Sequence, residues 1–311
     1  MSDKFKNLVV RTLSGFVLLG IVLLAILWSK WSLVLLLAAI IIGGLREFYR
    51  MARMAGYSPQ RLVGTVAGLI LLAVAFWLMH VMDEHPLVYW DRNIRGDYLL
   101  IIFGLFLFIT MLLPLMFIYE LFRKSSTPSA NVGTTLMGFV YVAMPLSMLL
   151  FIPLFLTPDI WRAKIVLFYI FIIWANDVFA YLFGITFGRH RLFERISPKK
   201  SWEGFVGGIL GAAVMGYIAG SSIISDMQEA HPAESIDCTA VMIQWIGLAL
   251  IAAISGVFGD LVESLFKRSV DLKDSGHIMP GHGGWLDRFD ALLLSIPFAF
   301  IYLACCELFI L

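Results

Sequence analysis

Long runs of apolar residues alternate with short polar segments along this chain of 311 residues. A run of about 18 or more apolar residues predicts a membrane-crossing helix, because about 20 residues at roughly 1.5 Å each span the hydrocarbon. The pattern predicts an all-α, polytopic integral membrane protein with about nine transmembrane helices. These are expected at 8–28, 31–45, 62–82, 98–118, 134–156, 165–186, 203–225, 241–263 and 291–311.

Composition supports this prediction, because 60% of the residues are hydrophobic and only 14% are charged. The mean hydropathy of +0.88 argues against a soluble helical protein. The three cysteines lack the spacing of a disulfide framework or a zinc site, so we expect them to be structural.

The distribution of basic residues predicts the orientation. If the N-terminus is cytoplasmic and the C-terminus is outside, 18 of the 23 lysines and arginines fall on the cytoplasmic side, as the positive-inside rule requires. We therefore expect a cell (inner) membrane protein whose active site faces the cytoplasm. The five remaining basic residues, on the outer side, are Lys30, Arg92, Arg95, Arg162 and Lys164.

The chain divides by chemistry into residues 1–130 and 131–311. The first part is expected to consist of transmembrane helices without a recognisable motif, in which the charges of 46–50 lie at a helix end near the headgroups. Ser, Thr and Pro make 123–130 the best candidate linker. The second part is expected to be the catalytic region, with cytoplasmic loops at 188–204 and 264–290.

Asn176 and Asp177 lie inside an otherwise apolar predicted span. An ionisable side chain within the membrane is costly, which makes a functional role the first hypothesis. The alternative is a hydrogen bond between helices, or an ion pair with a lysine or arginine.

A basic segment precedes the span 203–225. Ser201 is a plausible N-cap of that helix, with Glu203 in its first turn. Lys199 and Lys200 beside a helix N-terminus would form a binding site for polyphosphate. The alternative is that these lysines only mark the cytoplasmic side.

Acids, hydroxyls and bases gather between 255 and 290. On a continuing helix, Asp260, Ser264 and Lys267 share one face, and so can Asp287 and Asp290. Carboxylates of this kind suit Mg²⁺, which commonly uses one or two of them together with substrate phosphates. The alternative is ion pairing of these acids with Lys267, Arg268 or Arg288 at the membrane surface.

The glycine-rich segment 280–284 would let backbone approach a phosphate closely. The alternative is a tight connector, which would be equally plausible without the flanking acids. His282 in this segment could bind phosphate, relay a proton or cap the loop.

Together these residues resemble the signature of phosphatidate cytidylyltransferases (CDP-diacylglycerol synthases). The resemblance covers about residues 170–290 and includes the SPKKSWEG segment and the Asn176-Asp177 span. Ser201 stands where the family often has Thr. The matching signature positions are Ser264, Lys267, Arg268, Lys273, Asp274, Pro280, Gly281, His282, Gly283, Gly284, Asp287, Arg288 and Asp290.

The resemblance implies that CTP and phosphatidate react to give CDP-diacylglycerol and pyrophosphate, with magnesium and potassium ions near Asp260 and Asp287. Membrane lipids and a second copy of the chain are the other expected partners, and no nucleic acid is expected. The catalytic residues would be Asp260, Asp287, Lys267 and Asp290. The substrate-binding residues would be Lys199, Lys200, Ser201, Ser264, Arg268, Lys273, Gly281, His282, Gly283, Gly284, Arg288, Asn176 and Asp177.

Two other functions are compatible with the residues. One is a CTP-dependent enzyme acting on another lipid, such as a polyprenol kinase or an archaeal-lipid cytidylyltransferase. The other is a transporter in which Asp177 and Asp260 line a pathway. Clustering of the acids beside a glycine-rich loop, rather than along a crossing, favours an enzyme.

Overall fold

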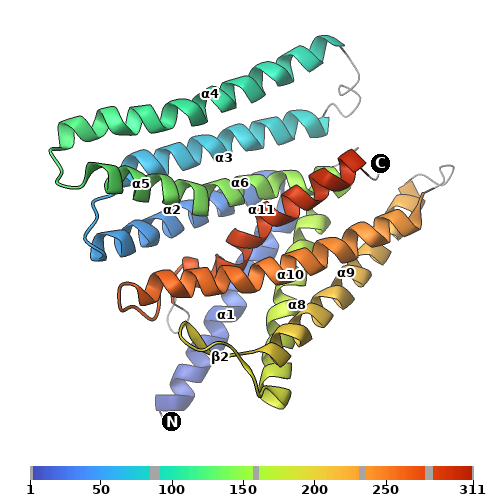
Figure 1. Ribbon diagram of the computed structural model, residues 1–311. Coiled ribbons are helices and arrows are strands. Elements are labelled where there is room, and N and C mark those ends of the chain that lie inside the picture. The colour runs from blue at the N-terminus through green and yellow to red at the C-terminus, as the bar shows by residue number, and fades with distance from the viewer. Residues whose placement is uncertain (1–2, 85–91, 157–160, 231–235, 277–282, 310–311) are drawn as a thin grey trace. The chain divides into compact units, whose positions relative to one another are not determined.

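The computed structural model describes residues 3–84, 92–156, 161–230, 236–276 and 283–309 (Figure 1). Each predicted apolar segment coincides with a helical segment among these residues. Eight of the described segments are long and apolar enough to cross a membrane; Pro128–Leu156 is one of them, whereas the apolar part of the first helix, Leu13–Trp28, is shorter. The prediction of a polytopic all-α membrane protein is therefore confirmed. The long helices are α1 (Asp3–Trp28), α2 (Lys30–Met54), α3 (Arg61–Glu84), α4 (Arg92–Arg123), α8 (Ala163–Phe187), α9 (Trp202–Ala230), α10 (Cys238–Arg268) and α11 (Leu286–Phe309).

The remaining span, from Pro128 to Leu156, is built from several short helical pieces. A π-helical turn, η2, comes just before Pro145, whose ring would otherwise crowd a carbonyl of the preceding turn. Pro128 opens this span at a position where the missing N–H is not needed, so the expected linker 123–130 is confined to 124–127. The pieces are α5 (Pro128–Gly138), η2 (Phe139–Ala143), α6 (Met144–Met148), η3 (Leu149–Phe151) and α7 (Ile152–Leu156).

The chain forms two compact units. The first contains the chain up to Phe151, with Trp161 and the segment Phe266–Phe289. In this unit α2 packs against α1, α3 and α5, and α4 packs against α3 and α5 (Figure 1). Tyr49 of α2 is fully buried and donates a hydrogen bond to the carbonyl of Thr135 (2.9 Å). Its ring fills the space beside Gly64, where a Cβ would lie 2.0 Å from the Tyr49 hydroxyl.

The second unit contains Ile152–Thr157, Arg162–Leu265 and Asp290–Leu311. Small residues repeat every four positions along α9, from Gly204 through Gly208 and Ala212 to Gly216 and Gly220, and all five are buried. Such a stripe lets two membrane helices approach closely. At Gly208 a Cβ would lie 2.6 Å from Oδ1 of Asn176 on α8, so the glycine permits the close α8–α9 contact.

Two short strands interrupt the expected loop 188–204. β1 (Arg191–Phe193) pairs antiparallel with β2 (Ser197–Ser201), with Arg191 opposite Ser201 and Phe193 opposite Ser197. This hairpin was not expected from the sequence. Several helices also extend beyond their predicted spans: α2 continues to Met54, α10 continues to Arg268 and α11 begins at Leu286. The segment between α10 and α11 is therefore shorter than the expected loop 264–290.

Candidate active site

A cavity of 560 Å³ lies in the second unit among α8, the β1–β2 hairpin, the start of α9 and α10. Its volume falls in the range of small-molecule sites, roughly 300–1,000 Å³. Five residues expected from the sequence to bind substrate or metal share its lining: Asp177, Lys199, Lys200, Ser201 and Asp260. The hairpin and α10, far apart in sequence, thus contribute to one cavity.

Lys200 and Asp260 form an ion pair in this cavity, with Nζ 2.6 Å from a carboxylate oxygen. The ammonium also approaches the carbonyl of Val257 at 3.5 Å. Both side chains remain partly open to solvent, and Lys199 is exposed. Lysine donors at a partly solvated cavity wall can turn toward an incoming phosphate, because their present partner is screened by water.

Ser201 is the N-cap of α9, as predicted. Its Oγ accepts a hydrogen bond from the N–H of Gly204 at 3.1 Å. Glu203, in the first turn of α9, contacts the segment that precedes β1. Its carboxylate accepts hydrogen bonds from the N–H groups of Arg189 and His190, and it lies 2.6 Å from Nδ1 of the His190 ring. These contacts hold the base of the hairpin against the helix N-terminus, next to Lys199 and Lys200.

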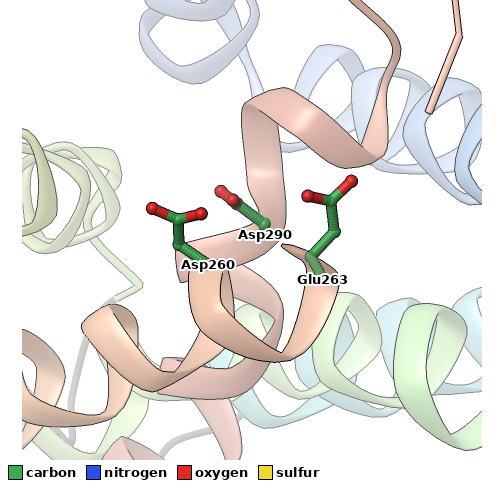
Figure 2. Close-up of side chains that lie close together, drawn as sticks. All are labelled: Asp260, Glu263 and Asp290. Carbon is green, nitrogen blue, oxygen red and sulfur yellow. The ribbon is translucent and has the colours of Figure 1, made fainter. Parts of the chain in front are cut away.

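Three carboxylates meet beside this cavity. Asp260 and Glu263 come from α10 and Asp290 from α11, and Figure 2 shows Asp290 between the other two. One oxygen from each lies within 4.8 Å of the others, and Glu263 is fully buried. Ser264 approaches Asp260 at 3.3 Å. Hard oxygen donors in this arrangement fit a divalent cation such as Mg²⁺.

Glu263 was not among the residues selected from the sequence. Its spacing of three from Asp260 was the available signal, because on a helix that spacing puts two carboxylates on one face.

Asn176 is also buried, and neither atom of its side-chain amide has a hydrogen-bond partner among the residues that the structure describes.

Asp287 belongs to the first unit and has a different environment. Its Oδ1 accepts a hydrogen bond from Lys267 at 2.6 Å. Its Oδ2 accepts from the backbone N–H of Ser275 (2.8 Å), the Ser275 hydroxyl (3.0 Å) and the N–H of Gly284 (2.7 Å). The described acidic cluster therefore contains Asp260 but not Asp287, and the role of Asp287 as a metal ligand stays a prediction.

Glu47 of α2 binds the segment that surrounds Asp287. No sequence pattern indicated this role, because the charges of 46–50 were expected only to mark a helix end near the lipid headgroups. The Glu47 side chain is buried and accepts three hydrogen bonds: from the Ser275 hydroxyl (2.8 Å) and from the N–H groups of Trp285 and Leu286 (3.0 Å each). A carboxylate is favourable there because α11 begins at Leu286 and helix N-termini carry partial positive charge.

The other expected substrate-binding residues are less enclosed. Arg268 donates to the carbonyl of Leu272 (3.0 Å), and Arg268, Lys273 and Arg288 are all exposed. Gly283 has φ +82°, and a Cβ there would lie 2.5 Å from the Asp287 carboxylate, so the turn requires glycine. Gly281 and His282 lie outside the described residues.

Comparison with known proteins identifies the family to which the chain belongs. The model of the cytidylyltransferase family matches residues 9–306. The chain belongs to the cytidylyltransferase family.

Curated members of this family align along most of the chain. The phosphatidate cytidylyltransferase of Haemophilus influenzae is 29% identical over 299 residues, covering 93% of this chain and 96% of the relative. That of Bacillus subtilis is 29% identical over 294 residues, covering 94% and 97%. That of Rickettsia prowazekii is 37% identical over 170 residues, covering 55% and 70%.

Proposed function

We propose that this protein transfers CMP from CTP to phosphatidate, giving CDP-diacylglycerol and pyrophosphate. The observation that carries the proposal is the single cavity in which Lys199, Lys200, Ser201 and Asp260 meet beside the acidic cluster. Basic side chains and a helix N-terminus suit a nucleotide triphosphate, and the adjacent carboxylates suit its metal. The names of the relatives supply phosphatidate as the acceptor.

The reaction needs little proton chemistry from the protein. An oxygen of the phosphatidate phosphate, already ionised at neutral pH, would attack the α-phosphorus of CTP. A new P–O–P linkage forms, the bond from the α-phosphorus to the bridging oxygen breaks, and pyrophosphate leaves with that electron pair. No strong general base is required, so catalysis rests on positioning and on neutralising charge.

The proposed roles follow the geometry of the second unit. Lys199 and Lys200 would bind the phosphates of CTP, Lys200 exchanging its contact with Asp260 for a phosphate oxygen. The first turn of α9, capped by Ser201, would face the same anion with its partial positive charge.

The acidic cluster would hold magnesium through Asp260, Glu263 and Asp290. Magnesium bound there would neutralise phosphate charge and orient the leaving group. We also propose that potassium is a second metal ion and that Asp287 is a metal ligand. Lys267 and Ser275 would in either case orient Asp287.

We propose that the site faces the cytoplasm of a cell (inner) membrane. The distribution of lysines and arginines supports this orientation, because 18 of the 23 then fall on the cytoplasmic side. Three of the five expected on the outer side are paired with acids: Lys30 contacts Asp83, while Lys164 and Arg162 lie 2.8 and 3.7 Å from Asp226.

Pyrophosphate release distinguishes the candidate functions. Purified full-length protein in neutral detergent micelles, supplied with CTP and Mg²⁺, should release pyrophosphate when phosphatidate is added and not when a polyprenol is added. A polyprenol kinase would instead produce CDP from CTP, and a transporter would release neither product. Pyrophosphate release that does not depend on phosphatidate would contradict the proposal.

A further inference from the structure

A second cavity, of 630 Å³, lies in the first unit and shares no residue with the cavity around Asp260. It is bounded by the later part of α2, the first turns of α3 and the end of α4. Three arginines from these three helices line it: Arg46, Arg61 and Arg123. Nothing in the proposed chemistry uses them.

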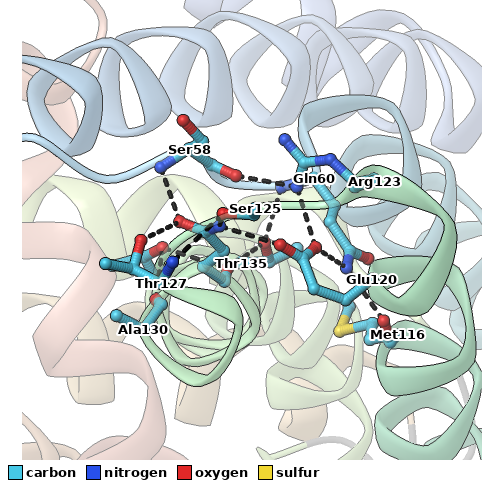
Figure 3. Close-up of polar contacts among 11 residues, drawn as sticks. Ser58, Gln60, Met116, Glu120, Arg123, Ser125, Thr127, Ala130 and Thr135 are labelled. Atoms are coloured by element: carbon cyan, nitrogen blue, oxygen red, sulfur yellow. Dashed lines mark hydrogen bonds and ion pairs between the residues drawn. The ribbon is translucent and has the colours of Figure 1, made fainter.

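The cavity carries net positive charge. Arg123 is compensated, since its guanidinium lies 2.9 Å from Glu120 and also donates to the carbonyl of Ser58 (2.8 Å) (Figure 3). Arg46 and Arg61 are exposed and form no ion pair with any residue that the structure describes. Two uncompensated guanidinium groups on one cavity wall favour an anion with several oxygen atoms, because each can donate paired hydrogen bonds.

The wall behind these arginines is fixed by buried hydrogen bonds. Glu120 accepts from Gln60 (2.7 Å) and Asn131 (2.8 Å) as well as from Arg123, and Figure 3 shows this network linking the α2–α3 connection to α4 and α5. The first turn of α3 adds the partial positive charge of a helix N-terminus, since Arg61, Leu62 and Val63 line the cavity. Arg123 and the backbone behind Arg46 and Arg61 are therefore held in place before a ligand binds.

Apolar side chains continue from the arginines along two neighbouring helices. On α3, Leu62, Val66 and Ile70 are exposed at a spacing of four residues, so they form one stripe that starts beside Arg61. On α2, Leu35 and Ile42 are exposed seven residues apart, and Arg46 follows one turn later. Both stripes end at an arginine, and both helices are long enough to cross a membrane.

We propose that this cavity binds an anionic phospholipid that is not consumed, with its phosphate on Arg46 and Arg61 and its acyl chains along the two stripes. A free phosphate would use the arginines but not the apolar stripes, and a neutral lipid would use the stripes but not the charge. Basic pockets between membrane helices bind anionic headgroups in this manner. The proposal is independent of the enzymatic activity.

Lipid-dependent stabilisation tests the proposal. Purified full-length protein in neutral detergent micelles is titrated with phosphatidylglycerol, and the thermal unfolding midpoint is recorded at each concentration. Wild-type protein and the matched control Arg53→Gln, an exposed arginine on α2 outside the cavity, should show the same rise. In the double variant Arg46→Gln/Arg61→Gln, the concentration giving half the rise should increase about tenfold or more.

Three results would overturn the assignment. Identical titrations for the wild type and the double variant would remove the arginines from any lipid site. An equal rise with phosphatidylcholine would show that headgroup charge is irrelevant, and an equal rise with glycerol 3-phosphate or inorganic phosphate would assign the cavity to a soluble anion. If the double variant does not fold, the single variant Arg61→Gln is judged by the same criteria.

Discussion

Replacing Glu47 with glutamine tests whether a residue outside the expected catalytic region positions the start of α11. Oε1 accepts from the N–H of Trp285, and Oε2 accepts from Leu286 N–H and the Ser275 hydroxyl. A glutamine has one acceptor oxygen, so its NH₂ group must face at least one of these donors. The variant keeps the size of the side chain and removes its charge.

The expected magnitude follows from the lost contacts. A hydrogen bond to a charged group contributes about 1.5–3 kcal/mol, and a buried donor left without a partner costs about 1–3 kcal/mol. The variant loses one of these hydrogen bonds and leaves one buried donor without an acceptor, so together the two effects should destabilise this helix start by about 2.5–6 kcal/mol. Since about 1.4 kcal/mol corresponds to a factor of ten, amide exchange at Trp285 and Leu286 should accelerate about 60-fold or more.

Hydrogen exchange followed by mass spectrometry on peptides covering 284–290 measures this effect. Glu194→Gln, the same substitution at an exposed position of the hairpin segment, should leave exchange in these peptides unchanged. Turnover should fall in Glu47→Gln and recover partly in Glu47→Asp, which restores the charge on a shorter side chain. Wild-type exchange and turnover in Glu47→Gln would refute the positioning role.

Three further predictions concern the second unit and the topology. Asp260→Asn should reduce turnover about a hundredfold or more by removing a carboxylate from the proposed metal site, and wild-type turnover at limiting Mg²⁺ would contradict that role. Gly208→Ala should lower the thermal unfolding midpoint because its Cβ would lie 2.6 Å from an oxygen of α8, whereas Gly133→Ala, with open space, should not. In a background lacking the native cysteines, Glu229→Cys should react with an impermeant thiol reagent on intact cells and Asp274→Cys should not. The reverse labelling would invert the topology. Both positions are exposed.

Local patterns predicted much of the architecture. Apolar runs located all eight described segments that are long and apolar enough to cross a membrane, because membrane helices satisfy their own backbone hydrogen bonds and need only length and hydropathy. The cap at Ser201 was also predictable, since the residues involved are three apart. Lys199, Ser201 and Asp260, all selected from the sequence, share one cavity although the hairpin and α10 are far apart along the chain.

Long-range contacts were beyond sequence reasoning. Glu47 binds Ser275 across 228 positions, and no periodicity in α2 separates it from its charged neighbours Arg46 and Arg50. Glu120, Gln60 and Asn131 likewise form a buried network whose members come from α4, the α2–α3 connection and α5. The hairpin was not predictable because Pro198, Lys199 and Lys200 are poor strand formers. Glu203 accepts hydrogen bonds from the segment that precedes β1, a contact that no local pattern indicates.

The bond that breaks in CTP tests the central claim most directly. Purified protein is incubated with phosphatidate and Mg²⁺, with CTP labelled either at the α- or at the γ-phosphate, and the lipids are extracted. The α-label should enter the lipid fraction, while the γ-label should be released as pyrophosphate. Label from the γ-phosphate in the lipid, with none from the α-phosphate, would identify a kinase and contradict the proposed function.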